Sequence, residues 1–160
     1  MPDITIACVG RIKEKFYTDA ISEYQKRLSR FCKFRITEVK DEATPDAPSP
    51  KEAALILEKE GGRLLEKIPE GAYVIALCIE GAQLSSEALA KKIDTLALSG
   101  KSRLCFVIGG SLGLSETIKK RADFQLSFSP MTFPHQLMRV ILSEQIYRAY
   151  TILSGQKYHK

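Results

Sequence analysis

The sequence has no apolar run long enough to cross a membrane. The longest uninterrupted apolar stretch, Ala72–Ile79, has eight residues, whereas a membrane-spanning helix needs about 20. The first residues, Met-Pro-Asp-Ile-Thr-Ile, lack a basic segment followed by a long apolar stretch, so we expect no secretory signal. These features predict a cytoplasmic protein with no membrane partner.

Metal-binding patterns are also missing. The chain has two histidines and four cysteines, with no C-x-x-C pair, which argues against a zinc site and leaves no metal predicted. Cys8, Cys78 and Cys105 lie inside apolar runs. We therefore interpret them as buried free thiols in strands, and we expect no disulfides in a reducing compartment.

The chain has the composition of one ordinary folded domain spanning residues 1–160. It contains 44% hydrophobic and 27% charged residues, which excludes disordered, collagenous and coiled-coil chains. The net charge of +5 is uneven: residues 1–40 and 101–160 are basic, and residues 41–100 are acidic. This pattern is typical of a protein with one face that meets a polyanion. A merely basic protein with no such partner is the alternative.

Strand and helix patterns alternate along the whole chain. Short β-branched or apolar runs predict strands at 4–9, 34–39, 73–79, 104–108 and 124–128. Apolar residues at helical spacing predict helices between them. Ser49, Pro50 and Glu52 form a capping-box pattern for a helix that reaches about Lys67, with Gly61-Gly62 as a weak point inside it. The alternation predicts an α/β fold with a mostly parallel sheet and helices on both faces.

Three loops follow predicted strands, and ligands bind beyond the carboxyl ends of strands in such folds. They are Glu80-Gly81, Gly109–Gly113 and Ser129–Pro134. The last helix, His135–Leu153, is apolar on more than one face. We therefore expect a homodimer, with deep burial inside one chain as the alternative.

Common catalytic motifs do not explain these loops. Gly109–Gly113 reads GGSLG, which matches neither G-x-G-x-x-G nor a P-loop. Ser111 lacks the spacing of a nucleophile elbow. Glycines at a strand end allow close approach of the backbone to a ligand, or simply a tight turn with positive φ. His135 is a candidate base or only a capping residue.

A set of longer motifs resembles one known family. IGGSLGL follows a predicted strand, LSFSPMTFPHQLMRVILSEQIYRA spans residues 126–149, and YHK closes the chain. Together these resemble the ribosomal RNA large subunit methyltransferase H family, which belongs to the SPOUT class of S-adenosylmethionine-dependent methyltransferases. The resemblance covers essentially the whole chain and is weakest at residues 41–50.

The resemblance implies a fold, a reaction and a substrate. The fold would be a single SPOUT domain whose cofactor-binding part, about 72–160, is tied in a trefoil knot. The chain would be a homodimer whose sites are completed by the partner subunit. It would methylate ring nitrogen 3 of a pseudouridine in large-subunit (23S) ribosomal RNA on the assembled ribosome. The resemblance assigns the S-adenosyl-L-methionine contacts to Leu77, Gly109, Phe128, Ser129, Pro130, Met131, Thr132 and Phe133.

Four side chains are candidates for the chemistry. The acceptor nitrogen must lose its proton, so a base, or a cation that stabilises the developing negative charge, would lower the barrier. The candidates are His135, Arg139, Tyr158 and His159. We hypothesise that Arg139 binds a phosphate or the developing anion, and that the tail orders over the pocket when RNA binds. Glu144 and Arg148 have the spacing of a helix ion pair, which we favour over a catalytic role.

Three other functions remain open from the sequence: a SPOUT methyltransferase acting on transfer RNA, a ribosome-binding protein without cofactor affinity, and a flavodoxin-like nucleotide-binding module. The first lacks support because no appended RNA-binding domain is visible. The intact glycine and MTFPH segments argue against the second. A co-purifying flavin would identify the third.

Overall fold

The computed structural model, which describes residues 1–160, contains one five-stranded sheet. All of its neighbouring strands pair in parallel, in the order β2-β1-β4-β3-β5. The strands are β1 Asp3–Val9, β2 Lys33–Val39, β3 Tyr73–Gln83, β4 Arg103–Ile108 and β5 Phe124–Ser127. The sequence prediction of a parallel sheet is confirmed.

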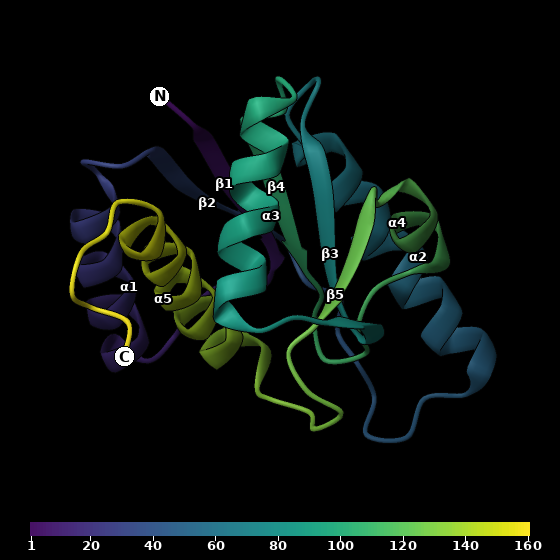
Figure 1. Cartoon of the computed structure of the whole chain (residues 1–160). Helices are drawn as coiled ribbons and strands as arrows, with labels where there is room; N and C mark the ends of the chain where they lie inside the picture. Colours follow the sequence, from purple (N-terminus) through teal and green to yellow (C-terminus); the bar gives the residue numbers. More distant parts are fainter.

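Helices cover both faces of this sheet, as predicted (Figure 1). One layer holds α1, α5 and α3 side by side, and the other holds α2 and α4. The helices are α1 Lys15–Leu28, α2 Pro50–Lys67, α3 Ser86–Leu98, α4 Glu116–Arg121 and α5 His135–Leu153. None of them is both long and apolar enough to span a bilayer.

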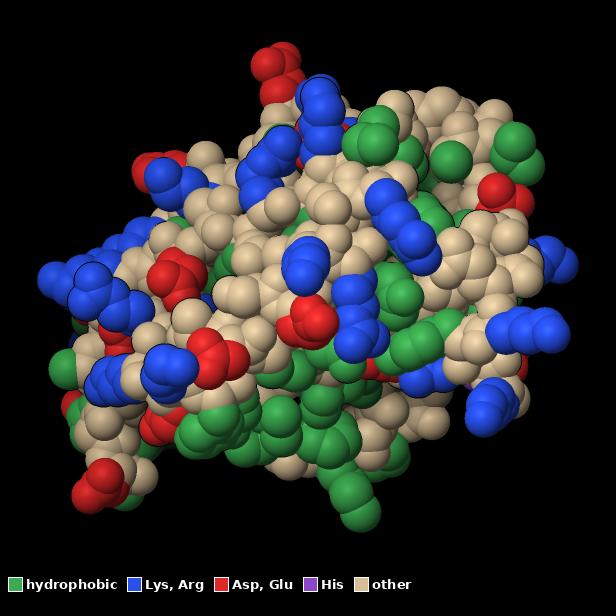
Figure 2. Space-filling model, turned by 90° about the vertical axis from the view of Figure 1, so that its left-hand side faces the viewer, with side chains coloured by type: hydrophobic (Ala, Val, Ile, Leu, Met, Phe, Trp, Pro, Cys, Tyr) green, Lys and Arg blue, Asp and Glu red, His purple; other side chains and the backbone are tan.

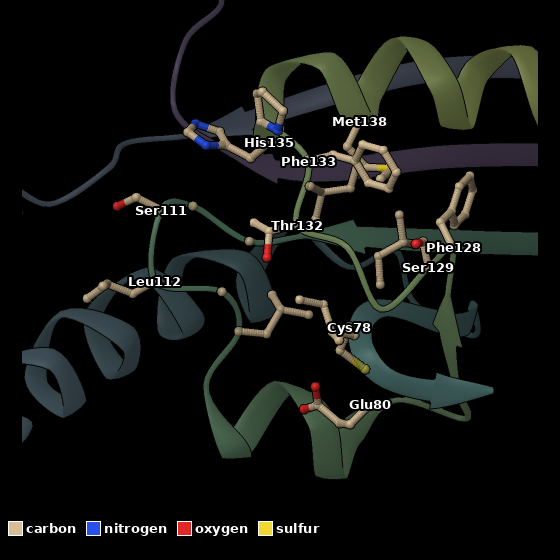
Figure 3. Close-up of a pocket in the computed structure, with 18 of the residues that line it drawn as sticks. Cys78, Glu80, Ser111, Leu112, Phe128, Ser129, Thr132, Phe133, His135 and Met138 are labelled. Atoms are coloured by element: carbon tan, nitrogen blue, oxygen red, sulfur yellow. The ribbon is translucent and has the colours of Figure 1, made fainter. Parts of the chain in front are cut away.

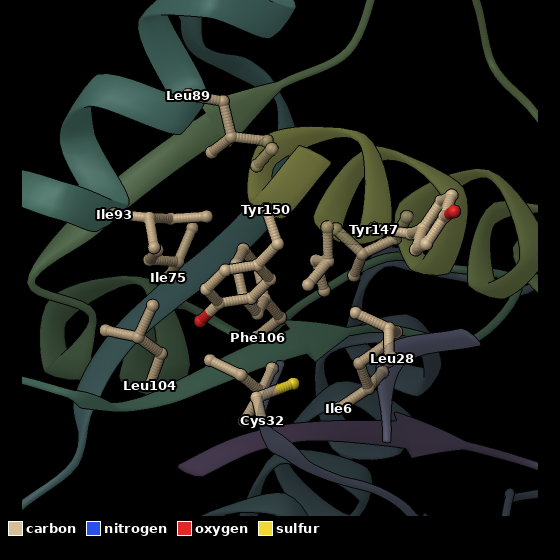
Figure 4. Packing of buried hydrophobic residues seen from close by; sticks show 14 of the residues in the cluster. Ile6, Leu28, Cys32, Ile75, Leu89, Ile93, Leu104, Phe106, Tyr147 and Tyr150 are labelled. Atoms are coloured by element: carbon tan, nitrogen blue, oxygen red, sulfur yellow. The ribbon is translucent and has the colours of Figure 1, made fainter. Parts of the chain in front are cut away.

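The strands build two cores because their side chains alternate between the faces. Ile4 and Ile6 of β1 pack toward α1, α3 and α5, whereas Ala7 and Val9 pack toward α2 and α4. Figure 4 shows the larger core, where Tyr150 of α5 lies over the sheet. β1 and β4 are buried on both faces, which explains their nearly continuous apolar sequences.

Helix α2 shows how local and tertiary signals combine. The predicted capping box is present: Ser49 Oγ accepts from the Glu52 amide, and Glu52 Oε1 accepts from the Ser49 amide, both at 3.1 Å. The helix runs unbroken through Gly61, although we expected a weak point there. A Cβ on Gly61 would lie 2.4 Å from Ser115 Oγ. The glycine therefore lets α2 pack closely against the start of α4.

Two predicted strand boundaries were wrong. β3 extends to Gln83, so Glu80 and Gly81 belong to the strand and not to a loop after it. The register between β3 and β5 shifts between Leu77 and Ala82, which is the signature of a bulge. β5 ends at Ser127, and Phe128 begins the following loop.

Helix α5 is buried largely by its own chain. It lies between α1 and α3, over the sheet. Its buried positions include Arg139, Ser143 and Thr151 as well as apolar residues. The apolar pattern of this helix therefore does not by itself require a second subunit, and the homodimer stays a prediction.

Candidate functional site

A cavity of about 690 Å³ lies where the predicted loops meet (Figure 3). Its walls come from the bulged part of β3, the loop after β4, the loop after β5, Lys119 of α4, and the start of α5. A cavity of this size suits a ligand of drug or cofactor dimensions. Its place at the carboxyl ends of the central strands is the one that the fold class predicts for a ligand.

The glycine loop after β4 is folded back on itself. Gly113 has φ +88°, and its amide donates to the Gly110 carbonyl at 3.1 Å. A Cβ on Gly109 would lie 2.2 Å from the Gly113 carbonyl oxygen. The tight turn with positive φ is confirmed, and the whole loop lines the cavity, side chains of Ser111 and Leu112 included. Close approach of its backbone to a ligand stays a prediction.

A buried carboxyl group lies behind this loop. Glu60 of α2 is 4% exposed, and one of its oxygens accepts from the Glu42 amide at 3.0 Å. Its other oxygen, Oε1, has no partner and would lie 3.3 Å from a Cβ on Gly110. Burial raises the pKa of Glu60. Glu60 thus packs against the loop from behind, a role that no local sequence signal indicated.

The segment after β5 forms the opposite wall. Ser127 Oγ donates to the Ser129 carbonyl at 3.2 Å, and the Met131 amide donates to Ser129 Oγ at 3.0 Å. These bonds hold the turn in place. Seven of the eight residues assigned to the cofactor line the cavity. Pro130 is exposed and is absent from its lining.

His135, the first residue of α5, is the one catalytic candidate that lines the cavity. Figure 3 shows its ring at the side of the cavity near Ser111. Burial is the main cause that lowers the pKa of His135, and the Arg139 charge adds to it, while Asp41 acts in the opposite direction. The imidazole is therefore neutral at pH 7 and able to accept a proton.

Arg139 has a different environment from the one that phosphate binding needs. Its side chain is 0% exposed, and it donates to the Val9 and Gly10 carbonyls at 2.9 and 2.8 Å. Its other terminal nitrogen lies 2.6 Å from Glu38 Oε2. Both terminal nitrogens of the guanidinium are thus engaged at the ends of β1 and β2, and Nε is buried without a partner. This burial argues against direct contact with RNA.

The tail residues lie away from the cavity of their own chain. The Tyr158 ring packs edge-on against Tyr147, with centroids 4.9 Å apart. His159 Nε2 lies 2.5 Å from Glu87 Oε1, and its Nδ1 lies 3.1 Å from an Arg148 nitrogen. The tail is therefore docked on the α1–α5–α3 layer, and neither residue lines the cavity.

Arg148 also takes part in the predicted helix ion pair. Its Nε lies 2.6 Å from Glu144 Oε1, at the expected i, i+4 spacing. This interpretation is confirmed.

Lys119 is a cavity residue that sequence reasoning missed. It projects from α4 and forms an ion pair with Glu80, whose Oε1 lies 2.5 Å from Lys119 Nζ. The only sequence signal for it is the basic end of a short helix, a pattern that is equally typical of a solvated surface.

No group of three or more His, Cys, Asp or Glu side chains is placed to hold a metal.

Comparisons with known proteins agree with this architecture. The family model described as "Predicted SPOUT methyltransferase" matches residues 3–159. The ribosomal RNA large subunit methyltransferase H of Clostridium novyi (strain NT) is 58% identical over 158 residues, 99% of each chain. The protein of the same name from Clostridioides difficile (strain 630) is 56% identical over the same coverage.

Solved structures show the same fold at low identity. A probable methylase family protein from Haemophilus influenzae Rd KW20 superposes with a TM-score of 0.56 at 12% identity, covering 98% of this chain and 70% of that chain. A probable methyltransferase from Bordetella pertussis Tohama I gives 0.55 at 12% identity, covering 92% and 96%.

Proposed function

The chain belongs to the SPOUT methyltransferase family, and we propose that it methylates ribosomal RNA of the large subunit with S-adenosylmethionine as cofactor. More specifically, we propose that the methyl group goes to ring nitrogen 3 of a pseudouridine in 23S RNA on the assembled ribosome. The observation that carries the proposal is the cavity at the carboxyl ends of the strands, which gathers residues from two of the three motifs of the resemblance in one place.

The cavity has the chemistry that this cofactor needs. Leu77, Leu126 and Phe128 give apolar walls for an adenine ring, and neighbouring backbone groups are available for its polar edge. Gly109 lets the loop after β4 fold back on itself, because a Cβ there would lie 2.2 Å from the Gly113 carbonyl oxygen. The bound cofactor would supply a methyl group activated by a sulfonium. The chain itself would contribute positioning, which supplies much of the acceleration of an in-line displacement.

His135 is the side chain that we assign to proton transfer. The acceptor nitrogen carries a proton that must leave, and a neutral imidazole at the cavity wall is suited to take it. The lowered pKa of His135 keeps the imidazole in its neutral form over the physiological range. Arg139 is assigned a supporting role instead, because it ties the end of β1 to the helix that begins with His135.

We further propose a homodimer in which the docked tail acts at the partner's site, with Tyr158 or His159 contacting the target nucleotide. Figure 2 supports this proposal, because hydrophobic side chains gather along the lower edge of the face that carries α1. The loop after β5 lies at the same lower end of the molecule in Figure 1. Phe16 at the start of α1 is 63% exposed and Met131 is 72% exposed. A partner chain that covered these side chains would remove apolar surface from water.

Basic side chains are spread over the rest of that face (Figure 2). They fit an RNA partner, because its phosphate backbone attracts Lys and Arg side chains. We also propose a single domain over residues 1–160, a trefoil knot within about 72–160, and a cytoplasmic location. Family membership supports these three proposals.

The test is transfer of a labelled methyl group to three acceptors from a strain that lacks this protein: intact ribosomes, free large-subunit RNA and transfer RNA. The product nucleoside would be identified by mass spectrometry. We expect methylpseudouridine, formed far better on ribosomes than on free RNA. Label on transfer RNA alone would overturn the substrate. Absence of label on every acceptor, despite cofactor binding, would overturn the proposed acceptor.

A further inference from the structure

The cavity contains one ion pair that the assigned cofactor contacts do not use. Glu80 and Lys119 are the only Asp, Glu, Lys or Arg residues in its lining, and Lys119 Nζ lies 2.5 Å from Glu80 Oε1. A second carboxylate, Glu116, lies 3.6 Å from the same nitrogen but 77% of its side chain is exposed. The cavity therefore presents one anion and one cation, side by side.

The elements that carry the two groups are linked, and both groups are charged. Gln125 of β5 donates from Nε2 to the Lys119 carbonyl at 3.3 Å, and Cys78 Sγ lies 3.4 Å from Gln125 Oε1. These contacts link the end of α4 to the bulged part of β3. The hydrogen bond from Lys119 lowers the pKa of Glu80, and the same bond raises the pKa of Lys119.

The pair is open enough to exchange partners. The Lys119 side chain is 22% exposed and that of Glu80 is 56% exposed. An ion pair with this exposure contributes little to folding, typically about 0–1 kcal/mol. A ligand that offers each group a new partner of opposite charge therefore meets little resistance from the existing contact.

The position of the pair fits one part of an elongated cofactor. Figure 3 shows Glu80 at the end of the cavity bordered by α4, whereas Phe128, Phe133 and Met138 lie at the opposite, apolar end. S-adenosylmethionine has a matching division, with a flat aromatic base at one end and an amino acid at the other. The amino-acid end carries one carboxylate and one ammonium, the complement of what the pair presents.

We propose that Glu80 and Lys119 bind the amino-acid end of S-adenosylmethionine, with Lys119 donating to its carboxylate and Glu80 accepting from its ammonium group. This inference rests on the proposed function and adds the residues that select the intact cofactor over its fragments. The pair then acts by binding and orientation, and no proton transfer is assigned to it. The methyl group would be left between the charged end and the apolar end of the cavity.

The experiment is a calorimetric titration with three ligands: S-adenosylmethionine, decarboxylated S-adenosylmethionine and 5′-methylthioadenosine, which lacks the whole amino-acid end. The proteins are the full-length wild type, Lys119→Met, Glu80→Gln and Lys120→Met. Lys120 is the matched control, because it lies on the same helix, carries the same charge and is exposed outside the cavity. Thermal unfolding of each variant checks that it is folded.

We expect Lys119→Met to weaken binding of S-adenosylmethionine about tenfold, as loss of a charge-assisted hydrogen bond does. It should leave 5′-methylthioadenosine and the decarboxylated cofactor within twofold of wild type. Glu80→Gln should weaken binding of both ligands that carry the ammonium, and Lys120→Met should change nothing.

Two results would overturn the inference alone. One is an equal loss for S-adenosylmethionine and 5′-methylthioadenosine, which would place the pair on the ribose or base. The other is unchanged affinity in both variants. A folded wild type that binds none of the three ligands would overturn the proposed function together with the inference.

Discussion

Replacing Arg139 with methionine should lower the free energy of unfolding by about 2–5 kcal/mol, because two carbonyl groups and one carboxylate lose their donor. The guanidinium is 0% exposed and donates to two carbonyl groups, those of Val9 and Gly10. Each carbonyl left without a donor costs about 1–3 kcal/mol. Glu38, the charged partner, is 39% exposed, so water would solvate it in part and limit the loss.

The assay is urea unfolding at one fixed protein concentration, since a dimer would make stability depend on concentration. For a chain of this size the loss corresponds to a fall in Tm of about 10 °C. Glu38→Gln is the matched control: it keeps an acceptor oxygen beside the guanidinium and should cost clearly less. If Arg139→Met kept the wild-type urea midpoint while binding of ribosomal RNA weakened, the guanidinium would contact a phosphate and the burial argument would be refuted.

Four further predictions address the helix, the cavity, the base and the tail. Gly61→Ala places a Cβ 2.4 Å from a serine hydroxyl and should destabilise by about 1–3 kcal/mol in urea unfolding. Gly62→Ala meets open space and should stabilise by about 0.5–1 kcal/mol; shifts of the same sign would contradict the packing argument. Gly109→Ala places a Cβ 2.2 Å from a backbone oxygen at the cavity wall. Calorimetry should therefore show at least about a tenfold loss of S-adenosylmethionine affinity. An unchanged Kd would show that the loop adapts. Because the pKa of His135 is lowered, the methylation rate should stay level above pH 6.5 and fall only below it. His135→Gln should abolish this fall at acid pH and lower kcat by about 10²-fold or more. If the wild-type rate already fell on acidification above pH 6.5, His135 would be excluded as the base. Deleting Tyr158–Lys160 should lower kcat or raise KM for ribosomes, with thermal unfolding as the control for lost packing; unchanged values of both constants would remove the tail from the mechanism.

The layer architecture was predictable because its signals are local and periodic. The apolar runs of β1 and β4 and the helical spacings between them depend only on nearby residues, and they indicated a parallel sheet covered on both faces. The capping box at Ser49 was equally readable. The ends of the strands were harder to predict, since the bulge that extends β3 to Gln83 depends on pairing with β5.

The location of the site was predictable for a topological reason. Parallel strands bring their carboxyl ends to one edge of the sheet, so the loops after β4 and β5 had to approach one another. The resemblance supplied the cofactor residues, and all of them except Pro130 line the cavity. Residues from elsewhere in the chain were harder to find, because Lys119 reaches the cavity only through the placement of a six-residue helix.

The sequence alone determined the succession of strands and helices, the two glycine- and proline-rich loops, and the family, since each of these depends on residues that are close together in the chain. Only the tertiary structure decided which charged side chains are buried, paired or open. Arg139 reads as a free cation on a helix, yet its partners lie 129 and 130 residues away at the end of β1. Whether a charge meets a ligand or a backbone carbonyl depends on which atoms the fold brings within about 3 Å of it, and that proximity is not encoded in any local pattern.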